Sequence, residues 1–191
     1  MDPKTLKSMR IKQVMITNGL LIALLTIVLT LFTMLRVTMV QMFVALAIIV
    51  LVQSLVRLLK GESTQSLIPI FEQVAIYEKQ KMGREWRKQH RMGFISDFIL
   101  SGVFLMEAYW SRGSTDVVME MDSRFMLLMI LFIIILMNIG LYIHIRKVDH
   151  STSQADFKGY TLKTSLIGLM GGLAVGVVMI VGIVFYVLNL A

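Results

Sequence analysis

The side chains that could carry out chemistry are few in this chain, and they do not form a recognisable catalytic set. There is no cysteine, which excludes disulfides, thiolate metal sites and thiol catalysis. The histidines His90, His144 and His150 lack the H-E-x-x-H spacing of a zinc protease, and neither a G-x-S-x-G sequence nor a P-loop occurs. We therefore expect a protein that is not an enzyme, with no catalytic, cofactor-binding or metal-binding residues.

Polar residues inside apolar segments are the next candidates, because they are costly in lipid and often functional. We expect the neutral and deeper Asn138 and Gln41 to form hydrogen bonds between helices. We expect Asp97 to pair with Arg91 or another nearby base, and Glu107 to reach the opposite interface. Further polar residues are expected near the cytoplasmic ends of their segments: Asn18, Gln53 and His144.

A basic stretch at about residues 66–92 predicts an amphipathic helix outside the membrane, because apolar residues recur in it at helical spacing. Its candidate contacts with anionic lipid headgroups or a protein partner are Lys79, Lys81, Arg84, Trp86, Arg87, Lys88 and Arg91. Cationic residues beside a membrane favour anionic lipid, and Met82 and Trp86 are expected to dip into the interface. A solvated loop that only sets orientation is the alternative, and nucleic acid is not expected as a partner.

Small residues recur every four positions near the C-terminus, at Thr164, Gly168, Gly172 and Gly176. Such a stripe lets two helix backbones approach closely in a membrane. We expect packing within the chain first, with a homo-oligomer interface and a backbone-lined path for a solute as alternatives.

The composition indicates that most of the chain lies in a membrane. Hydrophobic residues make up 57% of the 191 residues and charged residues only 16%, and the mean hydropathy is +0.76. A soluble core of this size cannot hide so much apolar surface, because small proteins retain a large surface relative to their volume. The fold class predicted is all-α, a polytopic transmembrane helix bundle forming a single integral membrane domain over residues 1–191.

Five spans are predicted, at about 14–35, 38–58, 94–110, 125–144 and 164–190. The apolar run that begins at Val14 is too long for one crossing, because a bilayer core of about 30 Å needs about 20 helical residues. We place a hairpin at Arg36, the charge in the interior of this run, between Thr33 and Thr38. The segment 94–110 is ambiguous because it is short and carries two acids, so four spans are the alternative.

The distribution of Lys and Arg favours five spans, since such residues accumulate on the cytoplasmic side. With five spans, 16 of the 19 basic residues share the side of residues 1–13, whereas four spans leave only 14 there. We expect the N-terminus in the cytoplasm and the C-terminus outside it, in a plasma membrane, as in a bacterial inner membrane. The function predicted is that of an accessory or regulatory component of a membrane complex, and the alternative is a small oligomeric transporter or channel.

Overall fold

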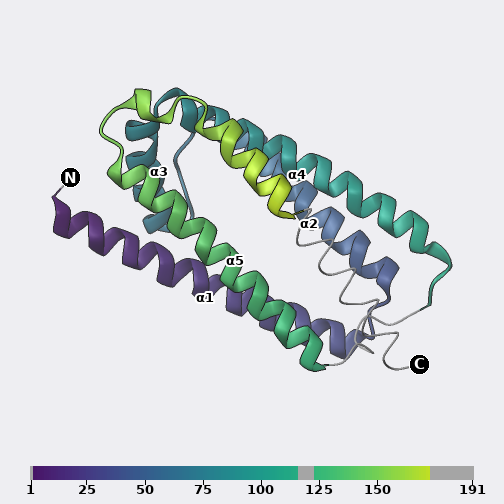
Figure 1. The fold of residues 1–191 in the computed structure, drawn as a ribbon. Coiled ribbons are helices and arrows are strands. Elements are labelled where there is room, and N and C mark those ends of the chain that lie inside the picture. Colours follow the sequence, from purple (N-terminus) through teal and green to yellow (C-terminus); the bar gives the residue numbers. More distant parts are fainter. Residues whose placement is uncertain (1, 116–122, 173–191) are drawn as a thin grey trace.

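The computed structural model describes residues 2–115 and 123–172, which are helical and contain no strand. The principal helices are α1 Pro3–Leu35, α2 Met39–Lys60, α3 Pro69–Met82, α4 Arg84–Trp110 and α5 Ser123–His150. Two short 3₁₀ helices follow α4 and α5, η1 Ser111–Gly113 and η3 Gln154–Phe157, and residues 160–172 are again helical. Figure 1 shows the long helices running between the same two ends of the molecule.

Four segments are long and apolar enough to cross a membrane: Pro3–Phe32, Met39–Lys60, Arg84–Gly113 and Ile130–His150. The predicted fold class is confirmed, because the chain is an all-α, multi-pass membrane protein. The ambiguous segment 94–110 lies within α4, so it belongs to one of these four helices. The predicted fifth span, 164–190, lies outside the described residues from position 173 onward.

The predicted turn at Arg36 is confirmed, although α1 and α2 do not pack along each other. Arg36 ends α1 in the left-handed conformation, with φ of 45°, and its N–H donates to the carbonyl oxygen of Phe32. Thr38 then begins α2 through a capping box, in which its hydroxyl accepts from Gln41 N and its own N–H donates to Gln41 Oε1. Such caps satisfy backbone groups that the helix itself leaves unpaired. Gln41 therefore lies in the first turn of α2, which corrects its expected position deep in the span.

The helices α2 and α4 pack along each other, and small residues bring their backbones close. The hydroxyl of Ser101 donates to the carbonyl oxygen of Ala47 at 2.9 Å, and Ser54 donates to that of Phe94 at 3.2 Å. Ala47, Ser54 and Ser101 are all buried. These contacts define the first of two helix pairs, visible side by side in Figure 1.

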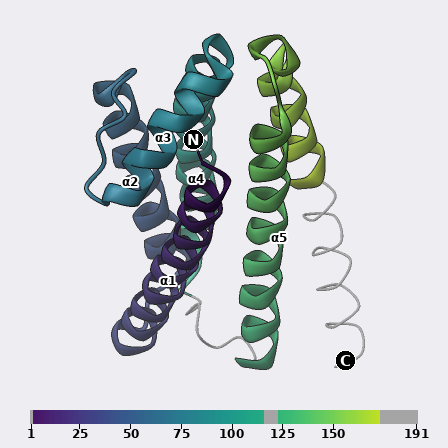
Figure 2. The same cartoon turned by 90° about the vertical axis from the view of Figure 1, so that its left-hand side faces the viewer.

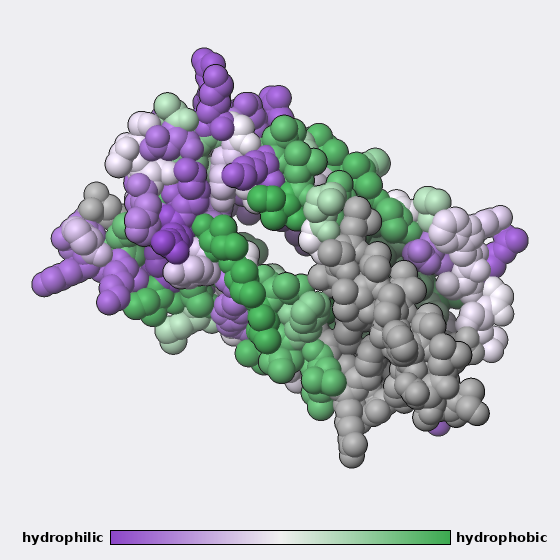
Figure 3. Space-filling model, in the orientation of Figure 1, coloured by the Kyte–Doolittle hydropathy of each residue, from purple (hydrophilic) through white to green (hydrophobic). Residues whose placement is uncertain are grey.

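The second pair is α1 and α5, joined by two asparagines that lie within segments long and apolar enough to cross a membrane. Asn18 Nδ2 donates to Asn138 Oδ1 at 2.9 Å, and Asn138 Nδ2 donates back to Asn18 Oδ1 at 2.8 Å. This confirms the expected interhelical role of Asn138, although Asn18 lies level with it rather than near a helix end. Figure 3 shows an opening between the two pairs, bordered by apolar side chains of the described helices.

The predicted amphipathic helix at 66–92 is wrong as a single element. The helix breaks at Gly83, which ends α3 with a φ of 56°. Residues other than glycine rarely adopt this backbone conformation. Residues 84–92 then start α4, which continues without interruption to Trp110. The basic stretch is thus divided between a separate helix and the beginning of a membrane span, and Figure 2 shows α3 lying across the bundle beside the start of α1.

Candidate functional site

One end of the molecule gathers most of its polar contacts, and we call residues 2–13, 61–92 and 144–163 the head region. It joins the start of α1, all of α3, the first turns of α4, the end of α5 and the segment that follows. Figure 3 shows a large group of hydrophilic side chains at this end, a smaller group at the opposite end, and apolar side chains between them. The basic flanks of the predicted spans therefore converge in space, as the charge pattern indicated.

A buried ion cluster lies at the centre of the head region. The Arg10 guanidinium, whose side chain is 7% exposed, contacts Asp149 Oδ1 at 2.7 Å and Glu78 Oε1 at 2.9 Å. His144 Nε2 lies 3.3 Å from the same Glu78 oxygen, and His144 Nδ1 lies 3.0 Å from the hydroxyl of Tyr160. The cluster thus ties α1, α3, α5 and the start of the following helix into one polar network.

The fork of donors on arginine suits this position, because it can bind two carboxylates from different directions. Arg10 reaches both oxygens of Asp149 through Nε, each at 3.2 Å, and its Nη1 also donates to Gln13 at 2.8 Å. The ring of Tyr77 lies 5.3 Å from the guanidinium carbon, which adds a cation–π contact. The charges are therefore neutralised within the protein, and their first role is to hold helices together.

The pKa of Glu78 makes this network sensitive to acid. Burial alone would raise it, but the hydrogen bonds with His144 and Arg10 and the charges of these two residues hold the pKa below its ordinary value. A carboxyl with a lowered folded pKa stabilises the fold fully above its unfolded pKa, and this stabilisation is lost as pH falls through the folded value.

We expect the melting temperature of the purified protein to be insensitive to Glu78 ionisation near neutral pH and to fall as the pH drops below the ordinary carboxyl pKa of about 4.3. A thermal unfolding series in detergent, compared with Glu78→Gln, measures this contribution. The variant is expected to start less stable and to change less across the acidic range. Parallel pH curves for the two proteins would contradict the assignment.

Two further side chains act as caps for helices other than their own. Lys81 Nζ lies 2.7 Å from the carbonyl oxygen of Ser151 and 3.3 Å from that of Asp149, where it satisfies the C-terminal end of α5. The buried Glu85 accepts from the backbone N–H of Thr161 at 3.2 Å and from Lys88 Nζ at 2.6 Å. Because cations suit helix C-termini and anions suit N-termini, both contacts fix the segment between α5 and residues 160–172.

The expectation that Trp86 and Met82 dip into the membrane interface is wrong. Trp86 is only 4% exposed and forms a core with Met82, Val148 and Phe157, so neither Trp86 nor Met82 dips into lipid. Lys81 is likewise committed to α5 rather than to an outside partner. Lys79 donates to the carbonyl oxygen of Glu62 at 2.6 Å and covers the Trp86 ring.

The remaining members of the predicted contact set keep exposed side chains: Arg84, Arg87, Lys88 and Arg91. A contact of these residues with headgroups or a partner stays a prediction.

The acids predicted within the membrane segments differ in their surroundings. Asp97 pairs with Arg57 of α2, whose Nη1 lies 3.2 Å from Asp97 Oδ2, and not with Arg91. Glu107 lies near the other end of α4, as expected, and its backbone carbonyl accepts from Ser111 N. Arg57 was not among the predicted site residues, although its position opposite an acid in a neighbouring apolar segment is a usable signal.

The glycine stripe is described only in part. An added Cβ at Gly168 or Gly172 would meet no atom within 4 Å, so the described residues do not pack another helix against this face. Gly176 lies outside the described residues. The roles predicted for Thr164, Gly168, Gly172 and Gly176 therefore stay predictions.

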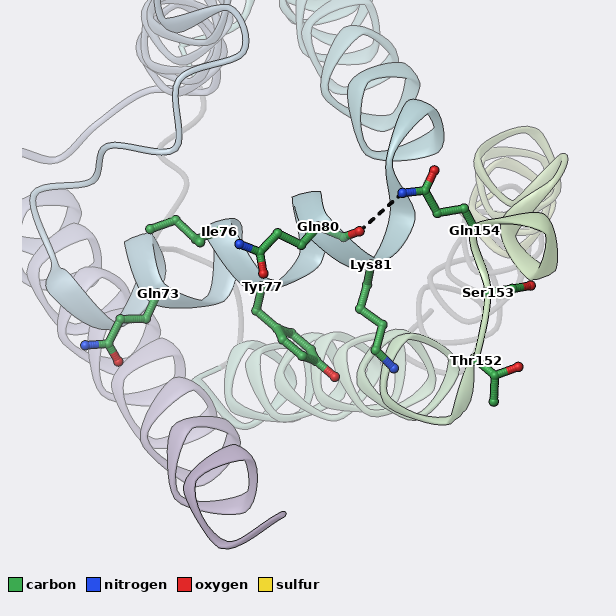
Figure 4. A pocket seen from close by; sticks show the side chains of 8 residues that line it. All are labelled: Gln73, Ile76, Tyr77, Gln80, Lys81, Thr152, Ser153 and Gln154. Carbon is green, nitrogen blue, oxygen red and sulfur yellow. Dashed lines mark hydrogen bonds between the residues drawn. The ribbon is translucent and has the colours of Figure 1, made fainter. Parts of the chain in front are cut away.

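An open hollow lies on the surface of the head region, between α3 and the segment after α5. Its volume is about 590 Å³, and Gln73, Gln80 and Gln154 present amides around Ile76 and Tyr77. Figure 4 shows these side chains, with Gln154 Nε2 donating to the backbone oxygen of Gln80 at 3.4 Å. Thr152, Ser153 and Lys81 complete the wall, so the hollow offers amide and hydroxyl groups and one lysine around an apolar floor.

Convergent metal ligands do not occur in the part of the chain that the structure describes, where no three histidine or carboxylate side chains are placed to hold an ion. The ion cluster was missed at the sequence level because its members lie far apart along the chain. Glu78 and Asp149 nevertheless carried a signal, since each is an acid inside a basic flank. No protein family, curated protein or solved structure matches the chain in the comparisons with known proteins.

Proposed function

We propose that this chain is a non-enzymatic accessory or regulatory component of a membrane complex, and that it meets its protein partner through the head region. The observation that carries the proposal is how the head region uses its charges. The buried Arg10, Glu78 and Asp149 are occupied with one another, and Lys81 is bound to the end of α5, whereas the amides and hydroxyls that line the open hollow beside them remain available to a partner.

The form of the hollow favours a protein over a small molecule. Sites for small molecules enclose most of the ligand, whereas this hollow is open, and protein interfaces combine apolar contacts with a polar rim. Here Ile76 and Tyr77 supply the apolar contacts, and three glutamines surround them with hydrogen-bonding groups. Gln73, Ile76 and Gln80 all lie on the exposed side of α3, where a partner can reach them.

We further propose five spans, with the head region in the cytoplasm of a bacterial cell and the C-terminus outside. Support comes from the charge distribution, since 16 of 19 basic residues then lie on the cytoplasmic side. The contacts of Arg10 with Asp149 and of Lys81 with the end of α5 are consistent with one shared side for the basic flanks.

A photo-crosslinking amino acid placed in the full chain at Gln73 or Gln154, in native membranes, tests the partner proposal. We expect the same crosslinked protein from both positions, because they line opposite walls of the hollow. The same substitution at Lys158, which is exposed and does not line this hollow, is the control. No product, or the same product from position 158, would refute docking at this surface.

The second candidate is a small oligomeric transporter or channel. The observation in its favour is the uncovered face at Gly168 and Gly172, against which the described helices pack nothing. A second copy of the chain would suit such a face. Flux through liposomes that contain only the purified chain, abolished by Gly172→Leu, would favour this candidate over the accessory role.

A further inference from the structure

A second hollow lies where the C-terminal end of α2 meets the first turns of α4. It has a volume of about 190 Å³, and arginines from both helices form its wall: Arg57 from α2 and Arg87 and Arg91 from α4. His90 belongs to the same wall and stacks on Trp86 with ring centroids 4.5 Å apart. We call this feature the arginine hollow.

The guanidinium groups of the arginine hollow have unused donors. Arg57 and Arg87 contact Asp97 and Glu62 as ion pairs, at 3.2 Å and 3.1 Å, but neither donates a hydrogen bond to any residue of the described chain. Arg91 is exposed and has no ion-pair partner among those residues. Each guanidinium carries five N–H donors, so the wall can supply several hydrogen bonds to one anion.

Arg57 lies against α4. Asp97 contacts it from that helix, and its Nη1 lies close to Gly93, where an added Cβ would require this side chain to move. A glycine at this point of α4 therefore leaves room for the arginine of α2. The two helices thus present three arginines around one hollow, Arg57 from α2 and Arg87 and Arg91 from α4.

The charge of the arginine hollow and the apolar residues in its lining indicate the kind of ligand. Three arginines oppose Glu62 and Asp97, and the charges of Lys60 and Lys79 also act on His90. Leu58 and Phe94 line the same hollow and lie in helices that are apolar enough to cross a membrane. A ligand that fits has an anionic head and an apolar tail attached to it, and it arrives from the bilayer.

We propose that the arginine hollow binds the phosphate group of an anionic phospholipid, with the glycerol and acyl region against Leu58 and Phe94. Basic pockets between transmembrane helices suit such headgroups, because guanidinium and phosphate form paired hydrogen bonds. This inference goes beyond the proposed partner docking and is independent of it, since the hollow at α3 and the arginine hollow share no lining residue.

Native mass spectrometry of the full chain in detergent, with added phosphatidylglycerol, tests the proposal. Arg87→Gln combined with Arg91→Gln removes two guanidinium groups from the hollow but leaves the Arg57–Asp97 ion pair between α2 and α4 intact. We expect one phosphatidylglycerol to be retained by the natural sequence and about 10- to 30-fold weaker retention by this variant. Phosphatidylcholine is expected to bind both proteins weakly and equally.

The matched control is Arg84→Gln combined with Arg146→Gln, which changes the net charge equally at exposed positions outside the arginine hollow. It is expected to retain phosphatidylglycerol like the natural sequence. Equal loss in both double variants would overturn the site, because it would mean nonspecific attraction to a basic surface. Competition by millimolar inorganic phosphate would also overturn it, by assigning the hollow to a soluble anion instead of a lipid.

Discussion

Replacing Arg10 with methionine is expected to destabilise the protein by about 3–5 kcal/mol, the cost of leaving buried charges without their partner. Methionine replaces only the aliphatic part of the arginine side chain, so Glu78 and Asp149 would then lie in a buried space without the guanidinium that pairs with both. Unfolding in detergent by titration with a denaturing surfactant, followed by circular dichroism, measures the loss.

The control for this change is Arg146→Met on α5, because Arg146 is exposed and forms no ion pair within the described residues. It is expected to change stability by less than about 0.5 kcal/mol. The deficit of Arg10→Met is also expected to shrink at acidic pH, where protonation neutralises the two carboxylates. A deficit equal to that of the control would show that the ion cluster does not hold the head region together.

Replacing Phe157 with alanine is expected to cost about 3–5 kcal/mol, as for other large aromatic residues removed from a core. Phe157 is 0% exposed and packs with Met82, Trp86 and Val148, while Tyr160 meets its ring edge-on at 6.0 Å. Its loss should release the segment after α5 from the start of α4, and with it the wall of the hollow that Thr152 and Gln154 form.

Tryptophan fluorescence reports this release directly. The chain has two tryptophans, and Trp110 is 67% exposed, so Trp110→Phe leaves the buried Trp86 as the only emitter. In that background, Phe157→Ala is expected to shift the emission to longer wavelength, as water reaches Trp86. Leu162→Ala, at a neighbouring exposed position, is expected to leave the emission unchanged, and an unshifted spectrum for Phe157→Ala would contradict the described packing.

Local signals were sufficient for much of the fold. The turn at Arg36 followed from one charge in a long apolar run, because the chain has few other ways to bring that charge to an interface. The helical nature of the segments and their apolar character followed from composition and the length that a bilayer requires. The ends of the helices were less predictable: α1 begins at Pro3 and α5 ends at His150, each well beyond the apolar residues.

Contacts between segments that lie far apart in the sequence could not be predicted from such local signals. A basic stretch has the same local pattern whether its lysines face solvent, as Lys88 does, or cap another helix, as Lys81 does. The burial of Trp86 likewise depends on Phe157 and Val148, which a single helix pattern cannot reveal. The partners of Arg10 come from α3 and α5, so the site required the tertiary arrangement before it could be recognised.

The break at Gly83 has a mechanical consequence. After this break, α4 is one continuous helix of 27 residues from Arg84 to Trp110, and its first turn contains Glu85, which accepts from the backbone N–H of Thr161. A change in the tilt of α4 within the bilayer therefore also moves Glu85 and Trp86, because they belong to the same continuous helix. Because Met82 and Lys79 of α3 contact Trp86, such a movement also reaches α3 and the ion cluster at Glu78.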